Sequence, residues 1–335
     1  MRAVVVALGK MGLPLATYIA RAGHEVVGCD VLQTTVPVGT TRTRFATGLE
    51  AASGLCAGED FDVVFSPERV SSGVVFRDLD TYPKLVGGLD AGGEARGVAR
   101  YEQFIGAEVR AMGSAEAAEL TKLAETTYRD LNIAYANELA RYADRLGLDV
   151  QRVIDAANSQ PYSHVHRPGV AVGGHCIPIY PHFLLSGDPG ARLARAGREV
   201  NSAMPAYAVD LLAGELGALE GRTVLIFGVA YRGGVKEHAF SGAAALRDEL
   251  LARGARPLAS DPMYSASDLA AAGYEPWAGE PADGAIVQTD HREYATLDAA
   301  GVGGAGVVVD GRGVLDRDAF ARAGVRVLRI GSPPS

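Results

Sequence analysis

The sequence contains only three cysteines, Cys29, Cys56 and Cys176, among 335 residues. An odd number of widely spaced cysteines does not form the framework of a disulfide-rich secreted domain, and it suits a reducing compartment. No run of lysines or arginines is present, and the 32 basic residues are outnumbered by 40 acidic ones. The resulting net charge of -8 argues against nucleic acids and anionic membranes as partners.

The N-terminus lacks a basic segment followed by a long apolar stretch, and it begins directly with a strand pattern over residues 2–8. We therefore predict no signal peptide, no transmembrane helix and no membrane partner, and we expect a cytoplasmic protein. The length predicts two or three domains, because a domain typically has about 150 residues.

The first 30 residues have the pattern of a dinucleotide-binding unit. Residues 2–8 and 25–30 are predicted as buried strands, and residues 13–22 between them as a helix. The turn before this helix reads Ala-x-Gly9-x-x-Gly12, so alanine replaces the first glycine of the usual fingerprint. Gly9 would let a pyrophosphate approach the helix N-terminus, and Gly12 would allow close packing of helix and strand.

Asp30 ends the second predicted strand, about 20 residues beyond the turn. A carboxylate at this place accepts hydrogen bonds from ribose hydroxyls and repels a 2′-phosphate, so it favours NAD over NADP. We therefore predict NAD as the cofactor. The residues predicted to bind it are Gly9, Lys10, Met11, Gly12, Asp30 and Thr35.

The chain is unusually short after Asp30, because only residues 31–33 separate it from the segment Thr34–Thr41. A complete nucleotide-binding domain of this kind has about six strands, and each βαβ unit takes roughly 30 residues. About two units are missing here, although strands are predicted again at 61–65 and 84–87. Either the N-terminal domain is naturally shortened, or the printed sequence lacks residues of the natural chain.

Residues 114–146 form a strongly helical segment without proline. Its apolar residues recur at helical spacing, which predicts one buried face. At about 1.5 Å per residue the helix would reach nearly 50 Å, long enough to bridge domains or to pack against a second subunit. Shorter helices at 150–157 and 192–216 are predicted on either side of a loop that carries Cys176.

A second α/β pattern begins with the buried run Thr-Val-Leu-Ile-Phe-Gly-Val-Ala at 223–230. The fold class is therefore α/β, with two Rossmann-like domains joined by a central helical region that contains one long helix. A helix is predicted at 243–253 and further strands at 256–261, 284–288, 307–309 and 325–330. The predicted domains are 1–112 for NAD, 113–216 for the central region and 217–330 for the C-terminal domain. The tail from Gly331 is predicted to be disordered.

Cys176 lies in the segment Val-Gly173-Gly174-His-Cys176-Ile-Pro178. The glycine pair lets the backbone approach a ligand closely, and the proline fixes the chain after the thiol. A lone cysteine is nevertheless more often a small inert hydrophobe than a nucleophile. The four histidines around this loop lack the spacing of zinc ligands, so we predict no metal site.

Several separated motifs resemble, in order, those of the nucleotide-sugar 6-dehydrogenases, the family that includes the UDP-glucose and UDP-N-acetylhexosamine dehydrogenases. The resemblance covers nearly the whole chain. The motifs are the N-terminal turn, Thr34–Thr41, Ser66–Val70, Ala118–Glu125, the Cys176 loop and Gly228–Arg232.

The resemblance implies an enzyme that oxidises a sugar C6 alcohol to a carboxylate with two NAD molecules in succession, through an aldehyde and an enzyme thioester. It implies Cys176 as the nucleophile, Lys122 as the cation that stabilises the oxyanion, and Glu68 as the base that activates water. Thr35 would hold that water. Thr126 would give the hydrogen bond that an asparagine gives elsewhere in the family.

The resemblance also implies a UDP-sugar as the substrate and a homodimer formed through the long central helix. The helix sequence around residues 127–134 favours the N-acetylhexosamine branch over the glucose branch. The substrate contacts that the resemblance implies are Arg69, Gly173, Gly174, Tyr231, Arg232 and Lys236.

Some positions depart from the family pattern. Tyr180 stands where the family usually has an aspartate, and a phenol with a pKa of about 10 cannot replace a carboxylate as a base at neutral pH. Ala239 stands in a segment that usually carries an arginine. Together with Thr126 and the short junction after Asp30, these departures leave an alternative open, namely a non-catalytic relative that binds UDP-sugars but not NAD.

Overall fold

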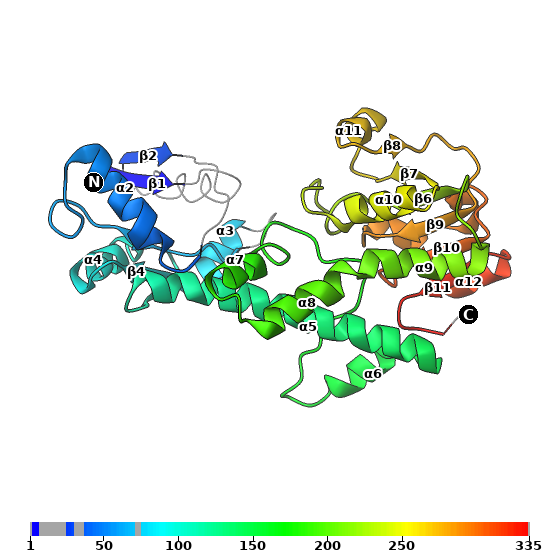
Figure 1. Cartoon of the computed structure of the whole chain (residues 1–335), viewed down its shortest axis with the longest axis horizontal. Coiled ribbons are helices and arrows are strands. Elements are labelled where there is room, and N and C mark those ends of the chain that lie inside the picture. Colours follow the sequence, from blue (N-terminus) through cyan, green and yellow to red (C-terminus); the bar gives the residue numbers. More distant parts are fainter. Residues whose placement is uncertain (1, 7–24, 30–36, 71–74, 334–335) are drawn as a thin grey trace. The chain divides into compact units, whose positions relative to one another are not determined.

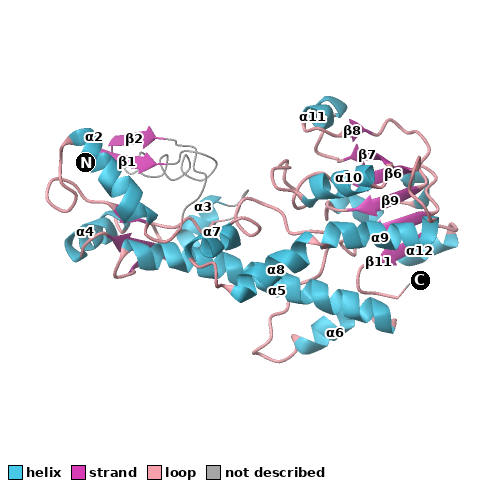
Figure 2. Cartoon of the chain, viewed as in Figure 1, coloured by secondary structure: helices cyan, strands magenta, loops and turns pink. Residues whose placement is uncertain are grey.

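The structure of the chain is a computed structural model that describes residues 2–6, 25–29, 37–70 and 75–333. The chain divides into two compact units. Unit 1 comprises residues 1–126 and 183–190, and unit 2 comprises residues 127–182 and 191–335. Each unit contains parallel β-sheet and helices, so the fold is mixed α/β, as the sequence predicts (Figures 1 and 2). The predicted division into three domains stays a prediction.

Unit 1 begins with a pair of parallel strands. β1 (Arg2–Val6) pairs with β2 (Glu25–Cys29) in a continuous register. Parallel neighbours require a crossover of a dozen or more residues between them, which agrees with the predicted βαβ start. The predicted turn and helix of this crossover lie in residues 7–24, outside the described residues.

A second sheet in unit 1 consists of β3 (Val64–Phe65), β4 (Lys84–Gly88) and β5 (Val109–Ala111). The central strand β4 is fully buried and pairs antiparallel with β3 and parallel with β5. The helix α4 (Ala91–Tyr101) packs on this sheet. Its Gly97 permits the close approach, because a Cβ there would lie 2.8 Å from a methyl group of Val64.

The sequence predicted neither α4 nor three further helical segments that the structure describes within residues 37–81 of unit 1. They are the π-helix η1 (Thr41–Ala46), α2 (Thr47–Ser53) and α3 (Val75–Thr81). The long helix α5 (Ala115–Leu146) begins in unit 1 and continues into unit 2, and it agrees closely with the predicted range of 114–146.

The helices of the central region differ from the prediction at one point. The single helix expected at 192–216 is divided into α8 (Arg192–Ser202) and α9 (Met204–Leu216). Pro205 explains the break, because proline lacks an N–H and its ring clashes with the preceding turn. The other helices are α6 (Val150–Ala157), as predicted, and α7 (Tyr180–Gly187), which directly follows the Cys176 loop.

The C-terminal sheet has six parallel strands in the order β11-β10-β9-β6-β7-β8, the doubly wound order of a Rossmann-like domain. The sequence predicted all of them except β8. The strands are β6 (Thr223–Phe227), β7 (Arg256–Ser260), β8 (Glu275–Pro276), β9 (Gly284–Val287), β10 (Val307–Asp310) and β11 (Arg326–Arg329).

Side chains of β6 alternate between two buried apolar clusters, as expected for a strand covered on both faces. Val224 and Ile226 join the cluster formed with α9 and α10 (Gly242–Ala252). Leu225 and Phe227 join the cluster on the opposite face, which includes Phe320 of α12 (Arg317–Arg322). The helix α11 (Ala266–Ala271) precedes the short edge strand β8.

The prediction of a disordered tail is wrong for its first residues. The carbonyl of Gly331 accepts a hydrogen bond of 2.6 Å from the amide of Val150, and Ser332 is buried. A Cβ at Gly331 would lie 2.8 Å from that of Ala140, so the glycine allows the tail to pass close to α5. Long-range packing therefore orders a segment whose composition suggests disorder.

Candidate active site

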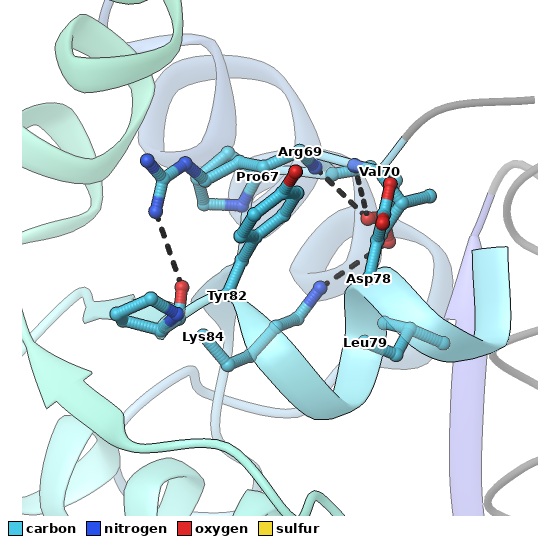
Figure 3. A pocket seen from close by; sticks show the side chains of 9 residues that line it. Pro67, Arg69, Val70, Asp78, Leu79, Tyr82 and Lys84 are labelled. Carbon is cyan, nitrogen blue, oxygen red and sulfur yellow. Dashed lines mark hydrogen bonds and ion pairs between the residues drawn. The ribbon is translucent and has the colours of Figure 1, made fainter. Parts of the chain in front are cut away.

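Glu68 lies in the loop after β3, and both of its carboxylate oxygens have partners in unit 1. Oε1 accepts hydrogen bonds from the backbone amides of Arg69 (2.9 Å) and Val70 (3.2 Å). Oε2 lies 3.3 Å from Nζ of Lys84, at the start of β4. Figure 3 shows these groups around a small pocket, which Tyr82 also lines. The carboxylate is thus fixed in place, as a positioned base requires.

Lys84 is a partner of Glu68 that the sequence did not predict. Its side chain is 6% exposed, and its ammonium group lies 5.6 Å from the ring centre of Tyr101 as well as near Glu68. A buried lysine needs such partners because desolvation of its charge is costly. The available signal was a lysine directly before the apolar run of a buried strand.

The structure brings Lys122 and Glu68 together, through the backbone of Glu68. Lys122 lies on the buried face of α5 and donates a hydrogen bond of 2.5 Å to the carbonyl oxygen of Glu68. One turn later, the hydroxyl of Thr126 donates to the carbonyl oxygen of Lys122 at 2.7 Å. The Thr126 hydroxyl carries one proton, so it would have to rotate before it could donate to an oxyanion.

Glu119, three residues before Lys122, anchors the segment that follows Thr35. Its carboxylate accepts hydrogen bonds from the amides of Gly39 (2.5 Å) and Thr41 (2.8 Å), and from the hydroxyl of Thr41. Glu119 is buried, so the same stretch of α5 that carries Lys122 fixes the start of η1. Thr35 itself lies outside the described residues, as do Gly9, Lys10, Met11, Gly12 and Asp30.

Arg69 points away from the Glu68 carboxylate. Its Nε lies 2.9 Å from Glu125 on α5, and Nη1 donates to the carbonyl oxygen of Pro83 at 3.2 Å (Figure 3). Its predicted contact with the substrate would therefore use the remaining guanidinium donors.

Cys176 lies in unit 2 as a partly exposed free thiol. Its carbonyl oxygen accepts a hydrogen bond of 2.9 Å from the amide of Tyr180, the first residue of α7. Gly174 has a φ of +98°, which favours glycine, and a Cβ there would lie 3.3 Å from the ring of Tyr231. A Cβ at Gly173 would lie 2.8 Å from that of Tyr231. The glycine pair therefore lets the cysteine loop pass against Tyr231.

Tyr180 is close enough to Cys176 for the thiolate to influence its titration. Burial, and after it the negative charge of the Cys176 thiolate, raises the pKa of Tyr180 to about 12. The phenol is therefore protonated at neutral pH. In the reverse direction, a protonated hydroxyl does not repel the thiolate as a carboxylate in its place would.

The C-terminal domain holds the loop with Tyr231 and Arg232 at the carboxyl end of β6. β6 lies between β7 and β9, so the order of the strands along the sheet reverses at β6. Doubly wound sheets bind ligands at such a reversal, beyond the carboxyl ends of the strands. The buried Asp261 accepts hydrogen bonds from the amides of Val229 (2.8 Å) and Ala230 (3.2 Å) and lies 3.1 Å from Nε2 of His291.

The electrostatics of Asp261 agree with this fixed loop. Burial by itself would raise the pKa of Asp261, but its hydrogen bonds, chiefly with His291, outweigh that effect and lower the pKa. Lys236, a predicted substrate contact, lies farther along and pairs with Asp268 at 2.7 Å on the surface. A diphosphate would have to compete with this carboxylate for Lys236.

In the described part of the chain, no group of three or more His, Cys, Asp or Glu side chains could hold a metal ion. Over the same residues, no helix combines the length and the apolar character needed to cross a membrane.

Comparison with known proteins assigns the class to which this fold and site belong. Residues 116–203 match the central domain of the UDP-glucose/GDP-mannose dehydrogenase family, and residues 225–317 match its UDP binding domain. A UDP-N-acetyl-D-mannosamine dehydrogenase from Pyrococcus horikoshii is 32% identical over 322 residues, which cover 90% of this chain and 74% of that protein. An NDP-N-acetyl-D-galactosaminuronic acid dehydrogenase from Ralstonia solanacearum is 32% identical over 319 residues, or 90% and 75% of the two chains.

A solved structure agrees with this assignment. The structure of UDP-D-ManNAc dehydrogenase from Pyrococcus horikoshii is similar with a TM-score of 0.85 at 25% identity, and the match covers 99% of each chain. The present chain therefore belongs to the UDP-glucose/GDP-mannose dehydrogenase family. It is an oxidoreductase of that family, which confirms the resemblance seen in its motifs.

Proposed function

We propose that this enzyme oxidises the C6 hydroxyl group of a UDP-N-acetylhexosamine to a carboxylate, with NAD as the oxidant and Cys176 as the nucleophile. The observation that carries the proposal is the free thiol of Cys176 at the start of α7, on a glycine loop that passes against Tyr231 of the C-terminal domain. The names of the related enzymes support an N-acetylhexosamine as the sugar. A UDP-hexose such as UDP-glucose is the second substrate class to be tested.

The thiol divides the second oxidation into two easier steps. The Cys176 thiolate adds to the C6 aldehyde and gives a thiohemiacetal, which becomes a thioester when C6 loses a hydride. Water then attacks the thioester carbon, so that the carbon–sulfur bond breaks and the carboxylate and the thiolate are released. Addition of the thiolate to the aldehyde and attack of water on the thioester each give a tetrahedral C6 with a negatively charged oxygen.

Lys122 and Glu68 supply the complementary groups in the proposal. The buried ammonium of Lys122 stabilises negative oxygen, because a fixed cation in a poorly solvated site is worth several kcal/mol, about 3 to 4 for a single donor. Glu68 removes a proton from the attacking water, and its two backbone hydrogen bonds hold the carboxylate ready. Since Tyr180 stays protonated, Glu68 serves alone as the carboxylate base.

The N-terminal residues would hold the dinucleotide. The parallel pairing of β1 with β2 fits the strand arrangement that a dinucleotide-binding motif requires. NAD supplies the acceptor for one hydride from C6 in each of the two oxidations. The residues proposed to hold it are Gly9, Lys10, Met11, Gly12, Asp30 and Thr35, with Arg69, Gly173, Gly174, Tyr231, Arg232 and Lys236 proposed for the UDP-sugar.

We also propose a homodimer that forms through α5. Three tyrosines on this helix, Tyr128, Tyr135 and Tyr142, recur every seven residues and are 59%, 54% and 54% exposed. A spacing of seven places them on one face of the helix, as in the contact stripe of a coiled coil. Exposed aromatic residues in a row are typical of protein interfaces. The free, unbridged Cys56 and Cys176 support a reducing, cytoplasmic location.

The proposal is tested by incubating the purified protein with NAD and a panel of UDP-N-acetylhexosamines and UDP-hexoses. Two NADH should form for each sugar consumed, and the product should be the hexuronate. Formation of one NADH per sugar would contradict the thioester route. If calorimetry shows that the protein binds the UDP-sugar but not NAD, and no turnover occurs, the result would instead support a non-catalytic relative.

The short junction after Asp30 needs its own measurement. Peptide mapping of the natural protein should find Asp30 followed by residues 31–33 and Thr34 if the shortening is natural. A longer peptide between Asp30 and Thr34 would show that the printed sequence lacks residues of the nucleotide domain.

A further inference from the structure

One buried hydrogen-bond network reaches both ends of the loop that carries Cys176. At the first end, the amide of Gly169 donates to Oδ1 of Asn137 at 2.9 Å. Nδ2 of Asn137 then donates to Oδ1 of Asn201 at 2.8 Å. Nδ2 of Asn201 in turn donates to Oδ1 (2.8 Å) and to the carbonyl oxygen (2.9 Å) of Asp130.

The network continues from Asp130 to the other end of the loop. The Asp130 carboxylate forms a two-bond ion pair with Arg198, with Nε at 2.8 Å and Nη2 at 2.7 Å. The remaining nitrogen, Nη1, donates to the carbonyl oxygen of Pro178 at 3.3 Å. Pro178 lies two residues after Cys176, so the guanidinium joins the ion pair directly to the backbone of the thiol loop.

All four network residues are buried in unit 2 and come from two helices. Asp130 and Asn137 lie seven residues apart on α5, and Arg198 and Asn201 lie three apart on α8. Asp130 and Asn137 are 0% exposed, Asn201 is 2% and Arg198 is 9% exposed. Such burial of charge is costly, and apolar residues of similar volume often stabilise a protein at least as well. Packing of α5 against α8 therefore does not by itself require these four polar residues, because apolar side chains could serve it.

A third contact fixes the middle of the loop. The amide of Gly174 donates to the carbonyl oxygen of Phe240 at 3.3 Å, and the glycine pair packs on Tyr231. The loop is thus attached at Gly169, at Gly174 and at Pro178. On the side of the loop that leads from the thiol into α7, the bond from Arg198 to Pro178 is joined by hydrogen bonds that the amides of Ile179 and Tyr180 donate to the carbonyl oxygen of Cys176.

We propose that Asp130, Asn137, Arg198 and Asn201 are positioning residues that hold the backbone on both sides of Cys176 in the geometry needed for attack on C6. This inference rests on the proposed function for the catalytic role of the thiol, but the clamp itself is a property of the free protein. Positioning matters because a displacement of about 1 Å at a reacting group can cost about a hundredfold in rate. The network acts through the loop and does not touch the substrate.

The test compares Arg198→Met with Arg198→Lys and with a matched control. Arg198→Met removes both the ion pair and the bond to Pro178, whereas lysine keeps the charge but cannot make all three hydrogen bonds. Tyr207→Phe is the control, because Tyr207 donates to Asp144 on the same helix α5 and has no hydrogen bond to the loop. Asn137→Ala is a second variant, in case Arg198→Met does not fold; it removes the bonds to Gly169 and Asn201 but keeps the ion pair of Asp130 with Arg198.

The first readout is amide hydrogen exchange in a peptide covering residues 169–182, measured on the free protein. Exchange there should become about tenfold faster or more in Arg198→Met and in Asn137→Ala, while peptides from the β6–β7 region keep their wild-type rates. Tyr207→Phe should leave the 169–182 peptide unchanged. Faster exchange over the whole of unit 2, equal in Arg198→Met and Tyr207→Phe, would overturn the clamp.

The second readout separates positioning from folding in the active enzyme. Arg198→Met should lower kcat by about tenfold to a hundredfold with less than about a threefold change in the KM for the UDP-sugar, and Arg198→Lys should recover part of the loss. An unchanged kcat per folded molecule would contradict the positioning role. If the wild type shows no dehydrogenase activity, the proposed function fails, yet the exchange experiment still decides whether the clamp exists.

Discussion

The ammonium group of Lys84 lies 3.3 Å from Oε2 of Glu68, and the lysine side chain is only 6% exposed. Removing the lysine would leave a partly buried carboxylate without its charged partner. Lys84→Met should therefore lower the free energy of unfolding by about 1 to 3 kcal/mol, which chemical denaturation can measure. It should also slow release of the acid product, because Glu68 is less well held.

The surface pair of Arg110 and Glu108 provides the control for Lys84→Met. Both side chains are more than half exposed, so Arg110→Met should leave the free energy of unfolding nearly unchanged. An equal decrease in the free energy of unfolding of the two variants would show that the Lys84–Glu68 contact stabilises the protein no more than a surface ion pair does.

Replacement of the thiol should stop formation of the acid. Cys176→Ser should reduce the rate of acid production by about a thousandfold or more, because a hydroxyl is a far weaker nucleophile than a thiolate. Cys56 is exposed in unit 1, so Cys56→Ser should keep wild-type activity. Product analysis by mass spectrometry distinguishes acid from aldehyde. Full activity in Cys176→Ser would exclude the thioester route.

Loss of the proposed base should trap the enzyme after both oxidations. Glu68→Gln should release about two NADH per active site in a rapid burst, and intact mass should then show the acyl group on Cys176. Glu116→Gln, at the surface pair with Arg42, is the control and should turn over normally. Steady turnover without a burst in Glu68→Gln would assign the base to another residue.

Tyr180 should make stability sensitive to alkaline pH. Its pKa is raised to about 12, first by burial and then by the Cys176 thiolate, from about 10 in an unfolded chain. A raised pKa contributes stability that is present below pH 10 and lost as pH rises toward 12. Between pH 9 and pH 11.5, the free energy of unfolding of Tyr180→Phe should therefore fall by about 1 to 2 kcal/mol less than that of the wild type, as measured by urea unfolding.

The contribution of the thiolate can be separated from that of burial. Cys176→Ala removes only the second cause, so it should reduce the alkaline loss by less than Tyr180→Phe does. If Tyr180→Phe and the wild type lose the same free energy of unfolding over this pH range, the pKa of Tyr180 is not raised in the folded protein.

The tyrosine stripe on α5 should control assembly. Tyr135→Glu places a charge in the middle of the stripe, and desolvation of that charge should convert a dimer to a monomer at micromolar concentration. Light scattering after size exclusion measures the mass. Leu251→Glu on the C-terminal domain, at a side chain that is 55% exposed, should keep the wild-type mass. A wild type that is monomeric at all concentrations would remove the dimer proposal.

Elements with a strong local period could be predicted from the sequence. Except for β8, the strands of the C-terminal sheet were recognised as continuous apolar runs, and the helix α5 was recognised because its apolar residues repeat at helical spacing. The short strands β5 and β8 were missed, since two or three residues carry no period. The predicted NAD residues and Thr35 lie outside the described residues, so they remain predictions from motif alone.

By itself the sequence determined the α/β class, the long helix and the family, and it identified Cys176, Lys122 and Glu68 as candidates. Only the tertiary structure decided how these groups are held. Lys84 meets Glu68 across 16 residues of chain, and Asp130 meets Arg198 across 68. A local pattern specifies which residues form an element and which face is buried, whereas the choice of polar partners inside the protein depends on packing between elements that are distant in sequence.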